Sequence, residues 1–332
     1  MASLRDVAAR AGVSVATASR VASGSAPVRP HTRERVERAM RDLLYVAPGR
    51  GPSTGAIGLL VPELQNPVFP ALAQAMEVNA TRFGLASILC NTAGSPHREA
   101  EYVHMLLDRR VDGMIFIASE VTDLRSDHGH YLRLLEEGAK LVFVNGGAPA
   151  LHVTSVGVDE RAAGRLAAEH LLSLGHALVG FAAGPEFTLP TREKRAGYEA
   201  ALLEAGLEPE DRLVAHAAFT VGGGREAAHR LLTARPRPTG VICSNDLIAI
   251  GVLQEAAALG LRVPEELSIV GFDGVAAAWT QPHLTTVEQP IDKIAETALD
   301  ALRGLIEQPD VELPSFVFRP RLRHGGTSAP PP

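Results

Sequence analysis

The sequence is poor in cysteine, in aromatic residues and in long apolar runs. It contains two cysteines among 332 residues, Cys90 and Cys243, each within a short apolar run typical of a strand. Two separate thiols build neither a disulfide framework nor a cysteine-rich metal site, so we expect buried free thiols and no bound metal. No run of about 18 apolar residues exists, and the N-terminus lacks the pattern of a signal peptide. We therefore expect a cytoplasmic protein.

Positive charge is also scarce overall, but it is unevenly distributed. The formal net charge of −6 argues, taken alone, against a nucleic-acid partner. Residues 1–50, however, hold nine Arg and no Lys against four acidic residues, so this segment carries +5 and the remainder −11. A solvated basic helix pair would explain the charge of this segment. A basic head on an acidic body is equally the asymmetry of a DNA-binding segment attached to a soluble sensor.

The stretch from Leu4 to Gly24 predicts two short helices joined by a tight turn. Apolar residues recur at one-turn spacing up to Ala11, Gly12 can end the first helix, and Ser14 can cap the second. On the second helix Ala18 and Val21 point inward, whereas the outward face carries small side chains, hydroxyls and one arginine. Such a face can approach a major groove, with Arg20 reading guanine. The predicted DNA-binding residues are Ser14, Val15, Ala16, Thr17, Ser19 and Arg20. A hairpin from any all-α domain is the alternative.

A third helix at about 33–44, capped by Thr32, would complete a small head at residues 1–46. A Pro- and Gly-rich linker follows at 47–55. It contains the pattern G-x-S-x-G at 51–55, which is typical of hydrolase nucleophiles. That motif requires a strand before it and a helix after it, whereas here a linker precedes it and a strand follows. We therefore reject a hydrolase site.

From residue 56 onward, apolar strand-like runs alternate with amphipathic helices, which indicates parallel sheets covered on both faces. The fold class is thus a small all-α helix-turn-helix head followed by an α/β core of two doubly wound parallel-sheet lobes. We expect lobe one at about 56–147 and 284–312, lobe two at about 150–280 and 313–323, and a disordered tail at 324–332. The first crossover between lobes is expected at 145–152, and no C-terminal leucine heptads are present to form a tetramer. Predicted strands are 57–61, 85–90, 113–117, 140–144, 178–183, 240–243 and 267–272; predicted helices are 67–83, 97–109, 131–137, 160–174, 191–205, 222–233, 246–258 and 291–306.

Ligands of doubly wound sheets bind beyond the carboxyl ends of the strands, so the residues that follow each strand are candidate ligand contacts. They combine amides, a carboxylate, cations and phenyl rings, which suit a polyhydroxylated small molecule. Asn245 could equally be only a helix cap, the Asp273-Gly274 pair only a turn, and Phe219 only core. The candidate residues are Asn66, Phe69, Ser119, Asn145, Arg192, Lys194, Phe219, Asn245 and Asp273.

The N-terminal run D-V-A-x-x-A-G-V-S-x-x-T-x-S-R-V, which begins at Asp6, resembles the DNA-binding segment of the lactose-repressor (LacI/GalR-type) family of bacterial transcription regulators. The resemblance covers nearly the whole chain and implies a core like that of the periplasmic sugar-binding proteins. It also implies a homodimer that binds an imperfectly palindromic operator and a small-molecule effector, most often a sugar, with no other cofactor and no membrane partner.

The resemblance maps the family's effector positions onto Phe219, Asn245 and Asp273, and onto Arg192 and Lys194. The family most often has Arg at the position of Lys194, and an ammonium cannot make the planar fork of a guanidinium. The linker is about five residues shorter than the family's usual form and lacks the leucine that enters the minor groove. Insertion of a hinge helix is therefore in doubt, although Arg50 could still contact a phosphate.

Three function classes follow from these observations. The first is a transcription regulator, usually a repressor, whose affinity for its operator is controlled by an effector between the lobes. The second is a solute-binding protein of transport type without DNA function, against which the basic head argues. The third is a nucleotide-dependent enzyme, and the sequence lacks G-x-G-x-x-G after the first strand, a Walker A lysine and H-E-x-x-H. We therefore predict a regulator that is not an enzyme. Whether the effector releases or promotes DNA binding stays open.

Overall fold

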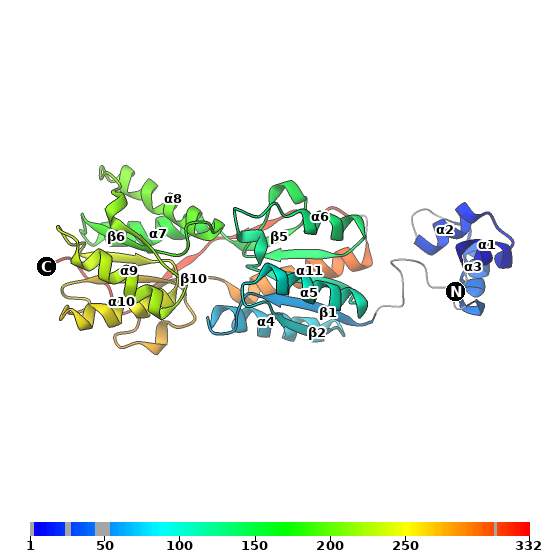
Figure 1. Cartoon of the computed structure of the whole chain (residues 1–332), viewed down its shortest axis with the longest axis horizontal. Helices are drawn as coiled ribbons and strands as arrows, with labels where there is room; N and C mark the ends of the chain where they lie inside the picture. Colours follow the sequence, from blue (N-terminus) through cyan, green and yellow to red (C-terminus); the bar gives the residue numbers. More distant parts are fainter. Residues whose placement is uncertain (1–2, 24–27, 44–53, 309–310) are drawn as a thin grey trace.

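The computed structural model describes residues 3–23, 28–43, 54–308 and 311–332 (Figure 1). The head contains α1 (Leu4–Ala11), α2 (Val15–Ser23) and α3 (Pro30–Asp42). Gly12 ends α1 with φ +60°, and the Ser14 hydroxyl accepts a hydrogen bond from the Thr17 amide at 3.1 Å, as predicted. Helix α3 begins at Pro30 rather than at 33, so Thr32 lies inside the helix and is not its cap. The small apolar core of the head is built from Val7, Ala8, Ala11, Ala18, Val21, Val36 and Ala39.

The first lobe is a sheet of strands in the order β11-β5-β4-β3-β1-β2, all in parallel. Helices α4 and α11 cover one face of this sheet and α5 and α6 the other, each with its own apolar cluster (Figure 1). Its strands are β1 (Ala56–Val61), β2 (Ala86–Asn91), β3 (Gly113–Ile117), β4 (Leu141–Val144), β5 (Ser155–Val158) and β11 (Phe316–Phe318); its helices are α4 (Val68–Arg82), α5 (Pro96–Asp108), α6 (Gly129–Glu136) and α11 (Ile291–Glu307).

The second lobe repeats this plan with the strand order β12-β10-β9-β8-β6-β7, in which β12 is antiparallel to β10. Helices α7 and α8 cover one face, and α9 and α10 the other. Its strands are β6 (Val179–Ala183), β7 (Val214–His216), β8 (Gly240–Cys243), β9 (Ser268–Asp273), β10 (Thr285–Glu288) and β12 (Arg321–Arg323); its helices are α7 (Glu160–Ser173), α8 (Leu189–Glu204), α9 (Val221–Thr233) and α10 (Asp246–Ala258).

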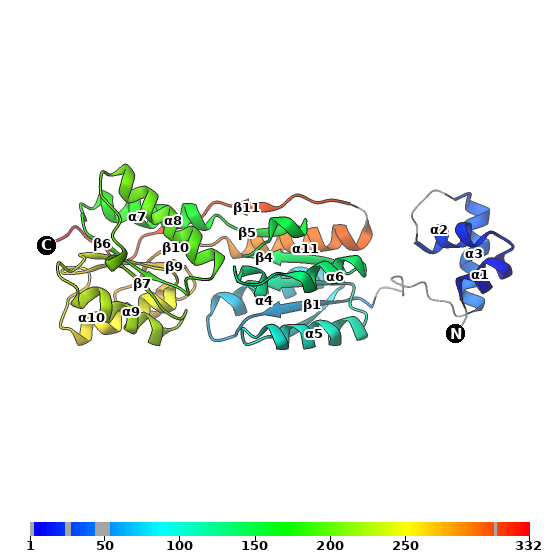
Figure 2. The same cartoon turned by 45° about the horizontal axis from the view of Figure 1, so that its top comes forward.

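The assignment of three strands to lobes was wrong. Strand β5 pairs with β4 and therefore ends the first lobe, so the first crossover follows residue 158 and not 145–152. Strand β10 pairs with β9 in the second lobe, although residues 284–312 were expected in the first. Strand β11 pairs with β5 in the first lobe, although 313–323 were expected in the second. Figure 2 shows this last segment running back along the first lobe before it enters the second. The chain thus crosses at 159, at 289–290 and at 319–320.

The C-terminal tail is ordered, contrary to the prediction of disorder. The Thr327 side chain is fully buried, where its hydroxyl donates to the Ile269 carbonyl at 2.7 Å and accepts from the Thr285 amide at 2.9 Å. The Ala329 amide donates to the Ser268 hydroxyl at 3.0 Å. The tail therefore supplies partners for polar groups on β9 and β10 that would otherwise be left unpaired. Composition alone signals none of these partners.

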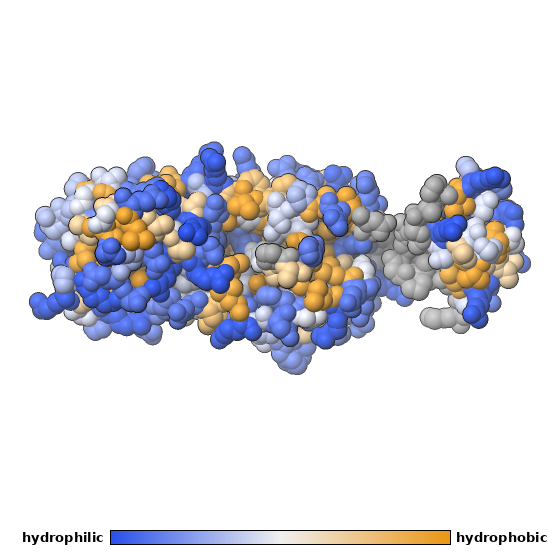
Figure 3. Space-filling view, turned by 90° about the horizontal axis from the view of Figure 1, so that it is seen from above, coloured by the Kyte–Doolittle hydropathy of each residue, from blue (hydrophilic) through white to orange (hydrophobic). Residues whose placement is uncertain are grey.

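Both cysteine side chains are buried, as expected, and burial raises the pKa of the Cys90 thiol to about 11. Within the described part of the chain, no helix is long and apolar enough to span a bilayer. The surface of both lobes is mainly hydrophilic, with separate apolar areas (Figure 3). The linker predicted at 47–55 falls almost entirely on residues outside the described ranges, and so does Arg50.

Removing residues 325–332 should lower the free energy of unfolding and change how it depends on pH. Each buried amide or carbonyl left unpaired on β9 and β10 costs about 1–3 kcal/mol. The pKa values of His170 and His176, which contact Ser328 and Ala329 of the tail, are lowered from 6.5 by burial. The folded chain therefore favours neutral imidazoles. Stability is full above pH 6.5 and falls as the pH drops below it, since the unfolded chain binds protons first.

Chemical denaturation of the full chain and of the truncated chain at a series of pH values between 8 and 5 would test this expectation, a range chosen because histidine titrates there. The truncated chain should be less stable and should lose less stability on acidification. A chain that lacks only residues 330–332 keeps the contacts of Thr327 and Ala329 and should resemble the full chain. Equal stability of all three chains would contradict a structural role of the tail.

Candidate functional site

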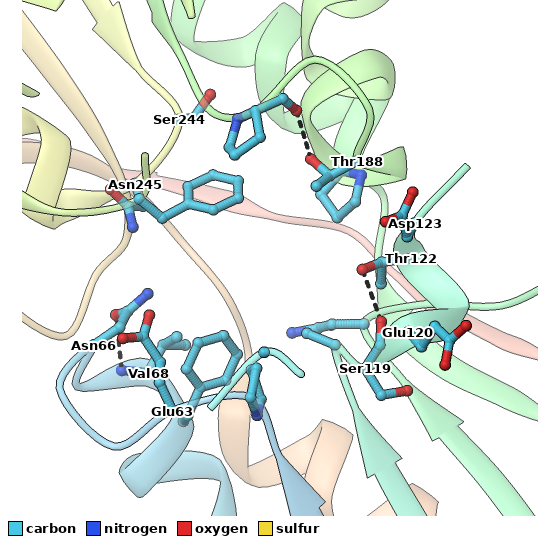
Figure 4. Close-up of a pocket in the computed structure, with 18 of the residues that line it drawn as sticks. Glu63, Asn66, Val68, Ser119, Glu120, Thr122, Asp123, Thr188, Ser244 and Asn245 are labelled. Atoms are coloured by element: carbon cyan, nitrogen blue, oxygen red, sulfur yellow. Dashed lines mark hydrogen bonds between the residues drawn. The ribbon is translucent and has the colours of Figure 1, made fainter. Parts of the chain in front are cut away.

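A cavity of about 290 Å³ lies between the two lobes, at the carboxyl ends of their strands (Figure 4). The first lobe contributes residues that follow β1, β3 and β4, and the second lobe contributes residues that follow β6, β8 and β9. This is the edge at which the parallel sheets were expected to bind a ligand. Eight of the nine predicted contact residues line it: Asn66, Phe69, Ser119, Asn145, Lys194, Phe219, Asn245 and Asp273.

Arg192 does not line the cavity. Its side chain is 58% exposed, and its Nε lies 3.6 Å from a carboxylate oxygen of Glu193. Two positions along a helix turn by about 200°, so Arg192 and Lys194 of α8 face nearly opposite directions. Because Lys194 points into the protein, Arg192 points to solvent.

Asn245 combines a capping role with a place on the cavity wall. Its side-chain oxygen accepts a hydrogen bond from the Ile248 amide at 2.8 Å and so caps α10, as the simpler interpretation held. Its Nδ2 atom is buried and has no hydrogen-bond partner, and the same holds for Oδ1 of Asn145 across the cavity. A buried amide without a partner is costly, so these two groups favour a ligand that supplies both donors and acceptors.

Lys194 owes its position to the close approach of α7 and α8. An added Cβ at Gly164 or at Gly197 would lie about 2.0 Å or 1.9 Å from a backbone oxygen of the facing helix, so only glycine fits at the contact. This packing brings the Lys194 ammonium into an ion pair with Glu160 of α7. The ammonium also lies 3.8 Å from the centre of the Phe272 ring. The cation in the cavity is therefore already paired with a carboxylate.

Asp273 is buried at the end of β9, at the unusual φ of +103°. Burial, with a smaller contribution from nearby Asp246, raises the pKa of its carboxyl group well above the ordinary value. Its Oδ1 accepts a hydrogen bond from Nε2 of Gln289 at 2.6 Å, and Oε1 of Gln289 accepts one from Nδ2 of Asn145 at 2.8 Å. Gln289 thus joins the two lobes through the residues that end β4 and β9.

Sequence reasoning missed Gln289 because the strand before it was placed in the wrong lobe. It also missed Phe187 and Phe272, which bring the phenyl rings on the cavity wall to four together with Phe69 and Phe219. The Phe219 ring packs where a side chain at position 184 would be, since an added Cβ at Gly184 would lie 2.2 Å from it. The Gly184-Pro185 turn after β6 was therefore a usable signal for an aromatic wall.

The cavity wall is acidic. Among the described residues that line it, Lys194 is the one cation, against six carboxyl groups: Glu63, Glu99, Glu120, Asp123, Glu160 and Asp273. Burial raises the pKa of Glu63, whereas the Arg125 guanidinium holds the pKa of Asp123 below its usual value. Such a wall repels anions and offers many acceptors to hydroxyl groups.

In the head, α2 presents the face that the sequence predicted. Ala18, Val21 and Ala22 are buried against α1 and α3, whereas Val15 is 45% exposed and Arg20 is exposed. The Arg35 guanidinium donates to the Ala11 and Gly12 carbonyls and so holds the turn before α2. The predicted DNA-binding residues Ser14, Val15, Ala16, Ser19 and Arg20 are exposed, and Thr17 is half-buried.

Comparisons with known proteins agree with this architecture. Residues 3–47 match the model described as bacterial regulatory proteins, lacI family, and residues 149–328 match the model of a periplasmic binding protein-like domain. The chain is 40% identical to an uncharacterized HTH-type transcriptional regulator from Streptomyces limosus, over 98% of this chain and 94% of the relative.

Two solved structures resemble the whole chain. The complex of the transcriptional regulator CelR with cellobiose superposes with a TM-score of 0.76 at 30% identity, over 98% of this chain and 100% of that one. The lac repressor dimer bound to operator and the anti-inducer ONPF superposes with a TM-score of 0.74 at 25% identity, over 99% of each chain.

A helix-turn-helix head joined to a two-lobed α/β core with a cavity between its lobes defines a class of DNA-binding transcription regulators. Within that class, the chain belongs to the lacI family of bacterial regulatory proteins. Its relatives are regulators and not enzymes, so the hypothesis of a nucleotide-dependent enzyme is discarded. The match of the head to the lacI model likewise removes the hypothesis of a transport-type solute-binding protein.

Proposed function

We propose that this protein is a cytoplasmic repressor that binds an imperfectly palindromic operator as a homodimer and responds to an uncharged sugar held between its lobes. The observation that carries the proposal is the cavity wall, where phenyl rings lie beside buried amides that lack partners. Phenyl faces suit the apolar faces of a sugar ring, and amides and carboxylates suit its hydroxyl groups. A relative of the same architecture is described in complex with cellobiose.

The proposed effector contacts are the eight predicted residues that line the cavity, together with Gln289. A ligand that touches Asn145 and Asp273 contacts both lobes and favours one arrangement of them over others. Coupling of about 1–3 kcal/mol, or roughly 5- to 150-fold in operator affinity, is typical of allosteric proteins.

The proposed DNA contacts are Ser14, Val15, Ala16, Thr17, Ser19 and Arg20 on or next to α2. Two such helices related by a two-fold axis would enter successive major grooves. Support for a homodimer comes from exposed apolar side chains at one edge of the first lobe: Val78 (46% exposed), Phe83 (38%) and Leu89 (47%). The lac repressor, which shares the architecture, is described as a dimer bound to operator.

The acidic cavity wall predicts discrimination between neutral and anionic sugars. Glucose, maltose, cellobiose and ribose, each compared with its phosphate ester where one exists, should be tested by thermal shift and calorimetry. At least one neutral sugar should stabilise the protein, and no phosphate should do so, because the single cation is paired with Glu160. Tighter binding of the phosphate than of the parent sugar would refute the proposed ligand class.

Asp273→Asn should abolish the response to that sugar and leave operator binding without sugar unchanged. Asparagine keeps the shape of the side chain and tolerates positive φ, but it offers one acceptor oxygen in place of two. Asp300→Asn, which alters an exposed carboxylate 3.5 Å from Arg303, is a matched control and should respond as the wild type does. Unchanged sugar affinity in Asp273→Asn would remove this residue from the site.

Arg20→Ala should weaken operator binding and relax discrimination at one base pair of each half-site, with a loss of about 1–3 kcal/mol per contact. The operator would first be obtained by selecting bound fragments from the native genome. Arg38→Ala removes the same charge from the exposed face of α3 and is the matched control. Fluorescence anisotropy with operator and with shuffled DNA measures both effects. Equal loss on the two DNAs in Arg20→Ala would make Arg20 a phosphate contact.

A further inference from the structure

Three side chains with metal-ligating atoms meet on the first-lobe wall of the cavity. Nε2 of His130, on α6, lies 3.8 Å from Oε1 of Glu99, on α5, and 3.7 Å from Oε2 of Glu120, which follows β3. All three ligand atoms lie within 4.8 Å of one another, and no other such group of three occurs among the residues that the structure describes. Glu120 is labelled in Figure 4, beside Ser119.

Neighbouring donors hold both carboxylates in place. The Tyr131 hydroxyl donates to Oε1 of Glu99, and the Glu120 amide donates to Oε2 of Glu99 at 3.3 Å. The Ser126 hydroxyl donates to Oε1 of Glu120 at 2.5 Å, which leaves Oε2 of Glu120 toward His130. Outer hydrogen bonds of this kind orient carboxylates that bind a metal.

The imidazole is the unexplained member of the group. Its ring lies against the buried Tyr131 ring, with 3.8 Å between centroids. Its Nε2 atom is buried and has no hydrogen-bond partner, because both carboxylate oxygens lie beyond the ordinary limit of about 3.2 Å. The gap is too wide for a hydrogen bond and close to that between donors around an ion. Zinc bonds of about 2.0–2.2 Å place tetrahedral ligand atoms roughly 3.4 Å apart.

We propose that Glu99, Glu120 and His130 bind one divalent cation, zinc in the first place, with its remaining coordination positions open to the cavity. One imidazole and two carboxylates form a donor set suited to zinc, and three protein ligands leave a position for water or a ligand oxygen. The ion would neutralise two of the six carboxylates on the cavity wall. This site goes beyond sugar binding and does not depend on it. The competing account is a protonated His130 that forms ion pairs with both carboxylates.

The test is calorimetric titration of the full-length protein, stripped with a chelator, with zinc chloride near neutral pH. One zinc per chain should bind. His130→Gln and Glu120→Gln should each weaken binding by about 100-fold or more, since even the loss of an outer-shell partner costs 10- to 100-fold. These side chains are 24% and 17% exposed, so their replacement disturbs folding less than that of Glu99, which is 3% exposed.

His97→Gln is the matched control, because His97 and Glu101 form an exposed pair on α5 at 3.3 Å without a third ligand. It should bind zinc as the wild type does. X-ray absorption of the zinc-loaded protein should show one nitrogen and several oxygen ligands at about 2.0–2.2 Å. Absence of zinc binding in the wild type, or wild-type binding in both His130→Gln and Glu120→Gln, would overturn the proposal. A metal-free His130 that stays protonated when excess zinc is added would also overturn it and support the ion pair.

Discussion

The hydrogen bonds of Gln289 are the constraint on which the geometry between the lobes depends. Gln289 is largely buried where the chain passes from β10 to α11, and its amide group bonds Asn145 at the end of β4 and Asp273 at the end of β9. A buried amide must keep such partners or lose several kcal/mol. Movement of one lobe against the other is therefore least costly as a rotation about this point. The cavity opens beside it, so a ligand there is well placed to sense that rotation.

The three crossings of the chain explain why local sequence signals predicted the elements better than their assembly. Periodicity located β3, β8 and α10 to the residue, because strand and helix spacing is a local property. Which sheet a strand joins is decided by pairing with distant residues. Val156 and Val158 of β5 read as the start of the second lobe, yet β5 joins β4 through bonds such as that from the Asn145 amide to the Val156 carbonyl. The tail failed for the same reason, since the partners of Thr327 lie about 40 and 60 residues earlier.

The cavity was more predictable than the fold around it because one geometric rule governs it. The carboxyl ends of parallel strands meet at one edge, so Asn66, Ser119 and Asp273 could be brought together without knowing the strand order. Helix phase was needed for the rest, and it separates Lys194 from Arg192. Gln289 and Glu160 escaped because their role comes from pairing between distant elements. The acidic first-lobe wall escaped because Glu99, Glu120 and His130 lie on three separate elements and belong to no motif.

The charge arrangement of the cavity follows from the lysine at position 194. A lone ammonium concentrates its charge on one nitrogen, and Glu160 together with the Phe272 ring occupies that nitrogen. A guanidinium in the same place would have further N–H groups to offer a ligand. With the cation satisfied inside the protein, the groups left to recognise a ligand are acceptors and neutral amides. The second lobe can thus hold hydroxyl groups but has no free cation for a phosphate, and any positive charge on the first-lobe wall must come from protonated His130 or from a bound metal ion.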